Sequence, residues 1–249
     1  MRVSARCLLW RLTALSAALL LTGCPVRPQV APPVTPPAAP APAAHVGVPY
    51  DVAGAESLLT ILVFKGGALA AAGHNHLIAS HELSGTFYVA SDVLQTTFEL
   101  HIPVGTLSVD ESALRSEEHS ADFPPEVPDS AKSGTKHNML GEALLDGEHH
   151  AEIVLRGLRL QEAQPPAPGA LVAEIEALVR DEPHTLRVPV HYERAAGTLI
   201  VSGDTSVRQT DLGLKPFSAM LGALQVQDEM RVRFRIVAHE SPTHGAAPR

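Results

Sequence analysis

A group of histidines is the part of the sequence whose residue types and spacing most suggest chemistry. His74 and His76 stand two positions apart in the segment Gly73-His74-Asn75-His76, and His81 follows closely. Residues two apart on a β-strand point to the same side, so both imidazoles would share one face, as the ligands of a metal ion do. Two histidines do not close a metal site. Three interpretations therefore stay open: a structural role, contact with a ligand headgroup, or metal binding.

Two arginines are the other candidates for holding a charged group. Arg208 stands three residues before Asp211. A guanidinium binds phosphate through two parallel hydrogen bonds, so Arg208 could meet an anionic headgroup. The favoured alternative is a structural pair in which Arg208 and Asp211 close a turn. Arg115 has the same ambiguity, and we expect it to be a solvated surface arginine.

Sequence motifs of common hydrolases are missing. The chain has no Gly-x-Ser-x-Gly segment and no His-Glu-x-x-His segment. These segments form the nucleophile turn of many serine hydrolases and the zinc site of many metalloproteases. We therefore predict that the protein is not an enzyme and that it has no catalytic residues and no cofactor.

The N-terminal residues have the pattern of an export signal. Three arginines lie among the first eleven residues, and the run Leu12–Leu21 carries no charge. A run of about ten residues is half the length that a membrane-spanning helix needs. The segment Leu21-Thr22-Gly23-Cys24 follows and resembles the lipobox of bacterial lipoproteins, in which the cysteine thiol takes a diacylglycerol. We predict a lipoprotein signal peptide at residues 1–23 and acylation of Cys24, for example with palmitate. The alternative is an ordinary signal peptide that carries a cysteine.

Cysteine usage agrees with this prediction. The chain has two cysteines, and Cys7 lies within the leader. Cys24 would therefore be alone in the mature chain, where lipidation would remove its free thiol. A multiply acylated N-terminus anchors a protein firmly to a membrane. Because Pro25 stands where an inner-membrane retention signal would place aspartate, we expect a cell-envelope protein on the outer membrane that faces the periplasm, if the cell has two membranes.

Composition divides the rest of the chain into a tether, a domain and a tail. Residues 24–49 are rich in Pro and Ala and have no apolar periodicity, which indicates a semi-rigid extended tether. Residues 50–240 have the length of one domain, and residues 241–249 are predicted to be a disordered tail. The net charge is −8, without clusters of Lys or Arg. This charge disfavours nucleic acid as a partner.

Apolar residues recur at every second position along most of the domain. Such alternation predicts antiparallel strands with one buried face, and many strands in one chain predict a sandwich or a closed barrel. The strands are expected at residues 85–89, 97–104, 153–155, 186–192, 199–201 and 230–236. The turn signals between them lie at residues 66–67, 146–147, 195–197 and 203–204. Residues 112–145 suit one or two short helices, and residues 217–224 suit a helical turn.

Several short motifs follow one another in a characteristic order. They are a strand at 59–64, Gly73-His74-Asn75-His76, Leu83–Phe87, Val104–Asp110, Asn138–Gly141, His150–Ile153 and Ser206–Leu214. This order resembles the YceI-like family of periplasmic and secreted lipid-binding proteins, over about residues 56–238. The chain departs from the family pattern in the middle, where an acidic insert separates Leu114-Arg115-Ser116 from Asp122-Phe123-Pro124. That departure concerns the ligand more than the fold.

The resemblance implies an all-β fold with short helices: an extended, antiparallel, lipocalin-like barrel of about eight strands. Such a barrel has room for one elongated ligand, and the family is linked to polyisoprenoids and similar amphiphiles. We therefore predict a non-enzymatic carrier of an isoprenoid or fatty-acid-like lipid, in which Phe98, Leu100, Val188 and Phe234 face the cavity. The alternatives are a metal-binding lipoprotein that uses the Gly-His-Asn-His segment and a structural module of the envelope.

Overall fold

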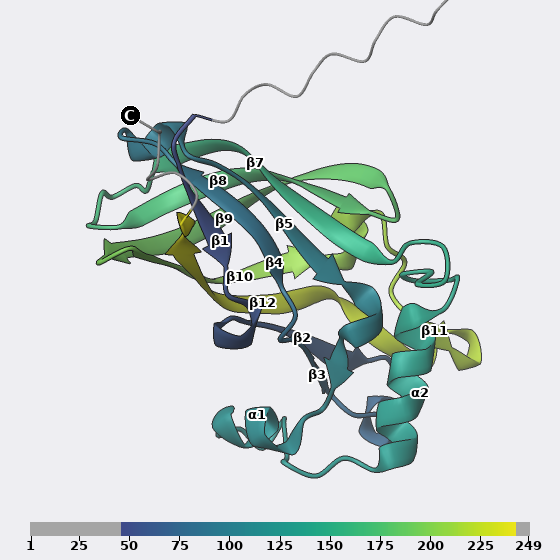
Figure 1. Ribbon diagram of the computed structural model, residues 1–249. Helices are drawn as coiled ribbons and strands as arrows, with labels where there is room; N and C mark the ends of the chain where they lie inside the picture. The colour runs from purple at the N-terminus through teal and green to yellow at the C-terminus, as the bar shows by residue number, and fades with distance from the viewer. Residues whose placement is uncertain (1–45, 243–249) are drawn as a thin grey trace, which may run out of the picture. The chain divides into compact units, whose positions relative to one another are not determined.

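Eight antiparallel strands close into a barrel in the computed structural model, which describes residues 46–242 (Figure 1). Around the barrel the order is β1, β4, β5, β7, β8, β9, β10 and β12, and β12 pairs again with β1. The predicted fold class is therefore confirmed. The predicted leader, Cys24, most of the tether and all but two residues of the tail lie outside the described residues.

The barrel strands vary in length, and β12 is the longest of them. They are β1 (Val48–Val52), β4 (Ser84–Val89), β5 (Thr97–Pro103), β7 (Glu152–Glu162), β8 (Ala170–Val179), β9 (Glu182–Ala195), β10 (Thr198–Arg208) and β12 (Leu224–Glu240). The other strands are β2 (Leu58–Gly66), β3 (His76–Ser80), β6 (Ser108–Val109) and β11 (Ser218–Ala219).

Short helices connect the strands. Two α-helices, α1 (Ser112–Glu117) and α2 (Asp129–Leu140), occupy the stretch predicted to be helical. The single 3-10 turns are η1 (Gly54–Glu56), η2 (Ala70–Ala72), η3 (Val93–Gln95), η4 (Val104–Thr106), η5 (Gln209–Leu212) and η6 (Met220–Gly222). Between residues 46 and 242, no helix has both the length and the apolar character needed to cross a membrane.

Alternation of side chains separates the inside of the barrel from its outside. Along β8, every second residue from Leu171 to Val179 is buried, and the residues between them are partly exposed. Neighbouring side chains on a strand point to opposite faces. One face of each strand therefore lines the barrel interior, as the period-two pattern predicts.

Strand β12 belongs both to the barrel and to an extension of the sheet. One edge of β12 pairs with β10 from His239 to Glu229. The other edge pairs with β1 at residues 238–240 and with β2 at residues 225–235. β2 then pairs with β3, and β3 with β6. The sheet therefore leaves the barrel through β2, β3 and β6, toward the region of α1 and α2 (Figure 1).

One predicted turn is wrong. Residues Gly203 and Asp204 lie inside β10, where they pair with Phe234 and Arg233 of β12. Glycine occurs within a strand where another group approaches closely. A Cβ atom on Gly203 would lie 2.5 Å from Cζ of Phe234, so this glycine makes space for a ring and does not end the strand.

Candidate functional site

The barrel contains a cavity of about 210 Å³. Its lining comes from β2, β4, β5, β7, β8, β9, β10 and β12, together with residues of η3 and η5. A water molecule needs about 10–15 Å³ of such space. The cavity is therefore much larger than a packing defect, and it extends from η3 near one end of the barrel to η5 near the other.

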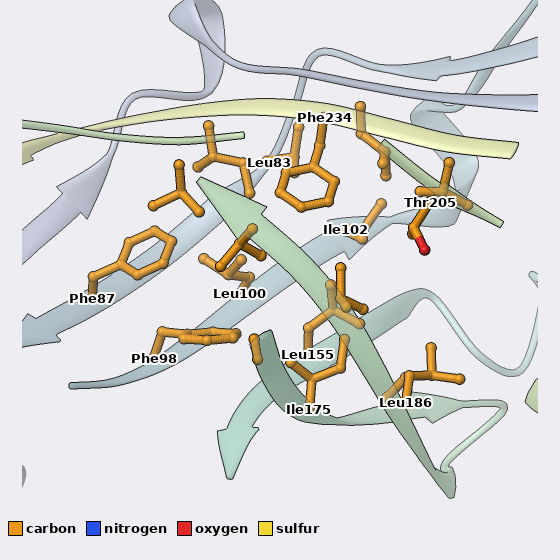
Figure 2. A pocket seen from close by; sticks show the side chains of 18 of the residues that line it. Leu83, Phe87, Phe98, Leu100, Ile102, Leu155, Ile175, Leu186, Thr205 and Phe234 are labelled. Atoms are coloured by element: carbon orange, nitrogen blue, oxygen red, sulfur yellow. The ribbon is translucent and has the colours of Figure 1, made fainter. Parts of the chain in front are cut away.

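The cavity wall is almost entirely hydrocarbon. Among the described residues, no charged side chain lines it, and the polar atoms of lining side chains are the hydroxyls of Thr96, Thr205 and Tyr192. Figure 2 shows the Thr205 hydroxyl among apolar side chains. An unpaired charge in such surroundings costs a great deal of free energy. The cavity therefore suits an apolar chain and excludes a buried ionic group.

The four residues that were predicted to face the cavity all line it. Phe98 and Leu100 come from β5, Val188 from β9 and Phe234 from β12, and three of them are labelled in Figure 2. The predicted phase of these strands is therefore confirmed. That the four side chains contact a ligand stays a prediction.

Two glycines shape the wall beside two of the aromatic rings. A Cβ atom on Gly157 would lie 2.7 Å from ring atoms of Phe98. The equivalent atom on Gly203 would meet the ring of Phe234 and also the backbone oxygen of Pro189, at 2.8 Å. Neither glycine was predicted from the sequence to lie beside the cavity. A glycine inside an alternating strand pattern is the signal that points to such a close approach.

A group of charged and polar side chains lies outside the cavity, between β3, β6, α1 and α2. Asp110 is fully buried, with both carboxylate oxygens engaged. Oδ1 accepts hydrogen bonds from Nη1 of Arg115 at 2.6 Å and from the backbone N–H of Leu77 at 2.9 Å. Oδ2 lies 2.6 Å from Nδ1 of His76, whose Nε2 lies 3.1 Å from the hydroxyl of Thr135. We call these side chains the Asp110 network.

The charge state of Asp110 follows from these contacts. Burial by itself would raise the pKa of the carboxyl group, because it penalises the ionised form. The hydrogen bonds from His76 and Leu77 and the positive charge of Arg115 outweigh burial and lower the pKa below its usual range. Asp110 is therefore an ionised, buried acceptor that holds three separate segments together.

The predicted surface position of Arg115 is wrong. Its side chain is fully buried, and it also donates to the backbone oxygens of Asn75 and Pro124. The guanidinium lies 5.3 Å from the ring centroid of Phe123. Through Asp110 and Asn75, Arg115 joins the segment that follows β6 to the residue that precedes β3. The partner, Asp110, lies in the turn before α1, which a local sequence pattern does not reveal.

The predicted histidine site is split between two environments. His74 is exposed, and its ring centroid lies 6.1 Å from that of His76, which belongs to the Asp110 network. Neither histidine lines the cavity. In residues 46–242 no group of three or more His, Cys, Asp or Glu side chains is placed to hold a metal ion. Both ring nitrogens of His76 have partners, which favours the structural interpretation of that residue.

Arg208 also lies outside the cavity lining. Its Nε atom lies 3.4 Å from Oδ2 of Asp211, and both side chains are exposed. Asp211 belongs to η5, directly after β10. The geometry is that of the turn-closing pair, and a contact between Arg208 and a ligand headgroup stays a prediction.

Comparisons with known proteins give the fold an independent check. No family model and no curated protein matches the sequence. Among solved structures, BcnA of Burkholderia cenocepacia is similar, with a TM-score of 0.54 and 12% identity over 75% of this chain and 99% of that chain. A polyisoprenoid binding domain from Saccharophagus degradans, implicated in plant cell wall breakdown, has a TM-score of 0.50 and 11% identity over 78% of this chain and 99% of that domain. The chain therefore has the fold of these two proteins, and the antiparallel barrel that the resemblance implied is confirmed.

Proposed function

We propose that the barrel holds one long-chain amphiphilic lipid, such as an isoprenoid, and does not convert it chemically. The observation that carries this proposal is the apolar cavity, whose described lining has no charged side chain. Each methylene group moved from water into such a site contributes about 0.8 kcal/mol. A chain of several methylenes would therefore bind without polar contacts inside the barrel, and its headgroup would stay at one end.

The similar domain from Saccharophagus degradans supports an isoprenoid as the class of ligand, because it is described as binding a polyisoprenoid. The wall of the cavity is consistent with that class. Branched and aromatic side chains line it, and a branched hydrocarbon makes dispersion contacts with such a surface at every methyl group.

The proposal includes a membrane anchor at Cys24. The leader, the lipobox-like segment and the Pro/Ala-rich residues 25–45 support an acylated chain of the cell envelope. An anchored barrel would stay beside the membrane that supplies or receives its lipid. A Cys24→Ser chain whose lipid loading and cellular role match those of the wild type would contradict this part of the proposal.

Organic extraction of the purified protein, followed by mass spectrometry, tests the cavity directly. The informative variant is Ala173→Phe, because Ala173 is fully buried on the cavity face of β8. A phenyl group there would occupy the space of the ligand. The matched control is Val172→Phe, on the next residue of the same strand and the opposite face.

We expect a prenyl or other long-chain lipid in extracts of the wild type and of Val172→Phe, and little or none in extracts of Ala173→Phe. Thermal unfolding of all three proteins shows whether the barrel still folds. Wild-type protein that yields no lipid and takes up none when refolded with a prenyl alcohol would disprove the proposal. Equal lipid in folded Ala173→Phe would show that the lipid binds elsewhere.

A further inference from the structure

Two neighbouring loops present large apolar side chains to solvent. The first covers residues 67–72, around η2, and the second covers residues 217–223, around η6. Leu221 is fully exposed, Met220 is 70% exposed, and Leu69 and Phe217 are 45% and 38% exposed. Exposed apolar side chains that gather in one place mark an interaction site more often than scattered ones do. We call these two loops the apolar tip.

The fold holds the apolar tip in a defined conformation. The N–H of Leu69 donates to the carbonyl oxygen of Ala223 at 2.7 Å, which joins the two loops. Met220 and Leu221 have φ angles of 51° and 54°. Left-handed backbone is unfavourable for an L-residue, because its Cβ atom lies too close to the following carbonyl oxygen. Met220 and Leu221 adopt this unfavourable conformation although their side chains remain exposed. Packing inside the protein therefore does not explain the conformation.

The two sequence stretches that contain the apolar tip differ in charge from the chain as a whole. The chain has 27 acidic and 19 basic residues. Yet no Asp or Glu occurs between Lys65 and His81, or between Leu212 and Gln227, and the two stretches contain Lys65 and Lys215. An apolar loop pair that is free of carboxylates and accompanied by lysines complements a surface of hydrocarbon beneath anionic headgroups.

We propose that the apolar tip inserts into the interface of a lipid bilayer that contains anionic lipids. Along the chain, the second loop lies between Leu212 and Met230, and both of these residues line the cavity. Membrane contact at this loop would therefore bring one end of the cavity to the bilayer surface. The contact is separate from the anchor proposed at Cys24 and does not depend on which ligand the cavity holds.

The two membrane contacts are compatible in length. The 21 residues between Cys24 and Val46 span up to about 65 Å when extended. The tether joins the domain beside residues 238–240 of β12, and the 17 residues of β12 that lead from there to the second loop span at most about 56 Å. An extended tether is therefore long enough for the anchor and the apolar tip to meet the same bilayer. Tethering raises the effective concentration of the apolar tip at the membrane, so a weak insertion is sufficient for occupancy.

An environment-sensitive fluorophore at single cysteines tests which surface meets lipid. In the full chain with Cys7→Ser and Cys24→Ser, the probe is placed at Leu221→Cys, or at Leu158→Cys as the matched control. Leu158 is a 51% exposed leucine on β7, a barrel strand that is not part of the apolar tip. Vesicles of phosphatidylethanolamine and phosphatidylglycerol are then added. The probe reports whether its own position enters the lipid, even if another part of the chain also binds the vesicle.

We expect blue-shifted, brighter emission at position 221 and no change at position 158. The effect should weaken with phosphatidylcholine vesicles and at high salt, because attraction to anionic headgroups is screened. In flotation, Met220→Ser/Leu221→Ser should bind vesicles about tenfold more weakly, whereas Leu158→Ser should not change. Unchanged emission at position 221, or equal changes at both positions, would overturn the proposal.

A second copy of the chain is the competing occupant of the apolar tip. A blue shift at position 221 that grows with protein concentration in the absence of vesicles would assign the surface to self-association and overturn the membrane proposal. Lipid extraction keeps the two proposals distinguishable. Protein with an empty cavity that still inserts position 221 would contradict the proposed function alone, whereas ligand-loaded protein that fails to insert would contradict this inference alone.

Discussion

The cavity and the Asp110 network are two interior regions built in opposite ways. The cavity wall is apolar and leaves about 210 Å³ unfilled. The Asp110 network is filled with polar groups, and both oxygens of its carboxylate have partners. Apolar contacts are not directional, so an apolar wall does not by itself impose one arrangement on what it surrounds. Hydrogen bonds to a buried charge fix one geometry. The cavity and the region that specifies the structure are therefore separate in this protein.

The largest effect should come from breaking the network. We expect Asp110→Ala to lower the free energy of unfolding by about 3–5 kcal/mol, because Arg115 would be left buried without its carboxylate partner. Urea unfolding measures this loss. The control is Asp204→Ala, which removes an exposed pair with Arg231 and should cost under about 1 kcal/mol. The lipid content of the folded fraction should stay unchanged. If it falls in proportion to stability, the two regions are not separate.

A smaller effect should come from Gly157 and Gly203, which lie beside the Phe98 and Phe234 rings of the cavity wall. Gly203→Ala should destabilise by about 1–3 kcal/mol, because its Cβ would meet the backbone oxygen of Pro189 as well as the Phe234 ring. Gly157→Ala should cost less, because the neighbouring atoms belong to the Phe98 ring and that ring can move into the cavity. We expect Gly157→Ala to reduce the lipid content, because the displaced Phe98 ring would occupy part of the cavity. Thermal unfolding and lipid extraction of both variants test this. Equal losses of stability would show that the Phe98 ring cannot move into the cavity.

Acid should weaken the network and leave the cavity wall unaffected. The pKa of Asp110 is lowered in the folded protein, so the folded state binds its proton less readily than the unfolded state. This contribution to stability is complete above the ordinary pKa of about 3.9 and is lost as the pH falls through the lower folded value. Urea unfolding at decreasing pH should therefore show a smaller acid loss in Asp110→Asn than in the wild type. Parallel pH profiles would refute the assignment.

The smallest effect should come from removing a polar atom from the cavity. Thr205 lines the cavity, and its hydroxyl makes a long hydrogen bond of 3.5 Å to the backbone oxygen of Ser206. We expect Thr205→Val to change the free energy of unfolding by less than about 0.5 kcal/mol and to leave lipid content unchanged. A marked loss of lipid would show that the headgroup binds inside the barrel, so that the cavity would depend on a polar contact as the Asp110 network does.

Sequence patterns predict the barrel strands unevenly, for physical reasons. β5 and β12 carry alternating Phe, Val, Ile and Leu, and their inward faces are predictable. β8 was not predicted, although its alternate residues are buried most regularly. Its Ala, Leu and Glu residues favour helices locally, and its neighbours β7 and β9 override that preference by pairing along both edges.

The cavity and the Asp110 network also differ in how well the sequence predicts them. The cavity residues are predictable from strand phase, because a period of two fixes which side chains share a face. The Asp110 network is not predictable, because it joins residues 34 positions apart across β3 and the turn before α1. Asp110 also has a φ angle of 55°, a turn conformation that its sequence neighbours do not indicate. Arg115 was therefore misjudged, while Phe98 and Phe234 were placed correctly.

The pairing of β1 with β12 has a consequence for how the barrel folds. Tyr50 pairs with Glu240, 190 residues later, so the first strand and the last strand close the barrel together. Contacts of such long sequence separation form slowly, because the entropy of loop closure must be overcome first. During synthesis, a chain that lacks its last strand can form hairpins but has no partner for that edge of β1. Closure of the barrel therefore waits for the C-terminal residues, which are the last to be synthesised.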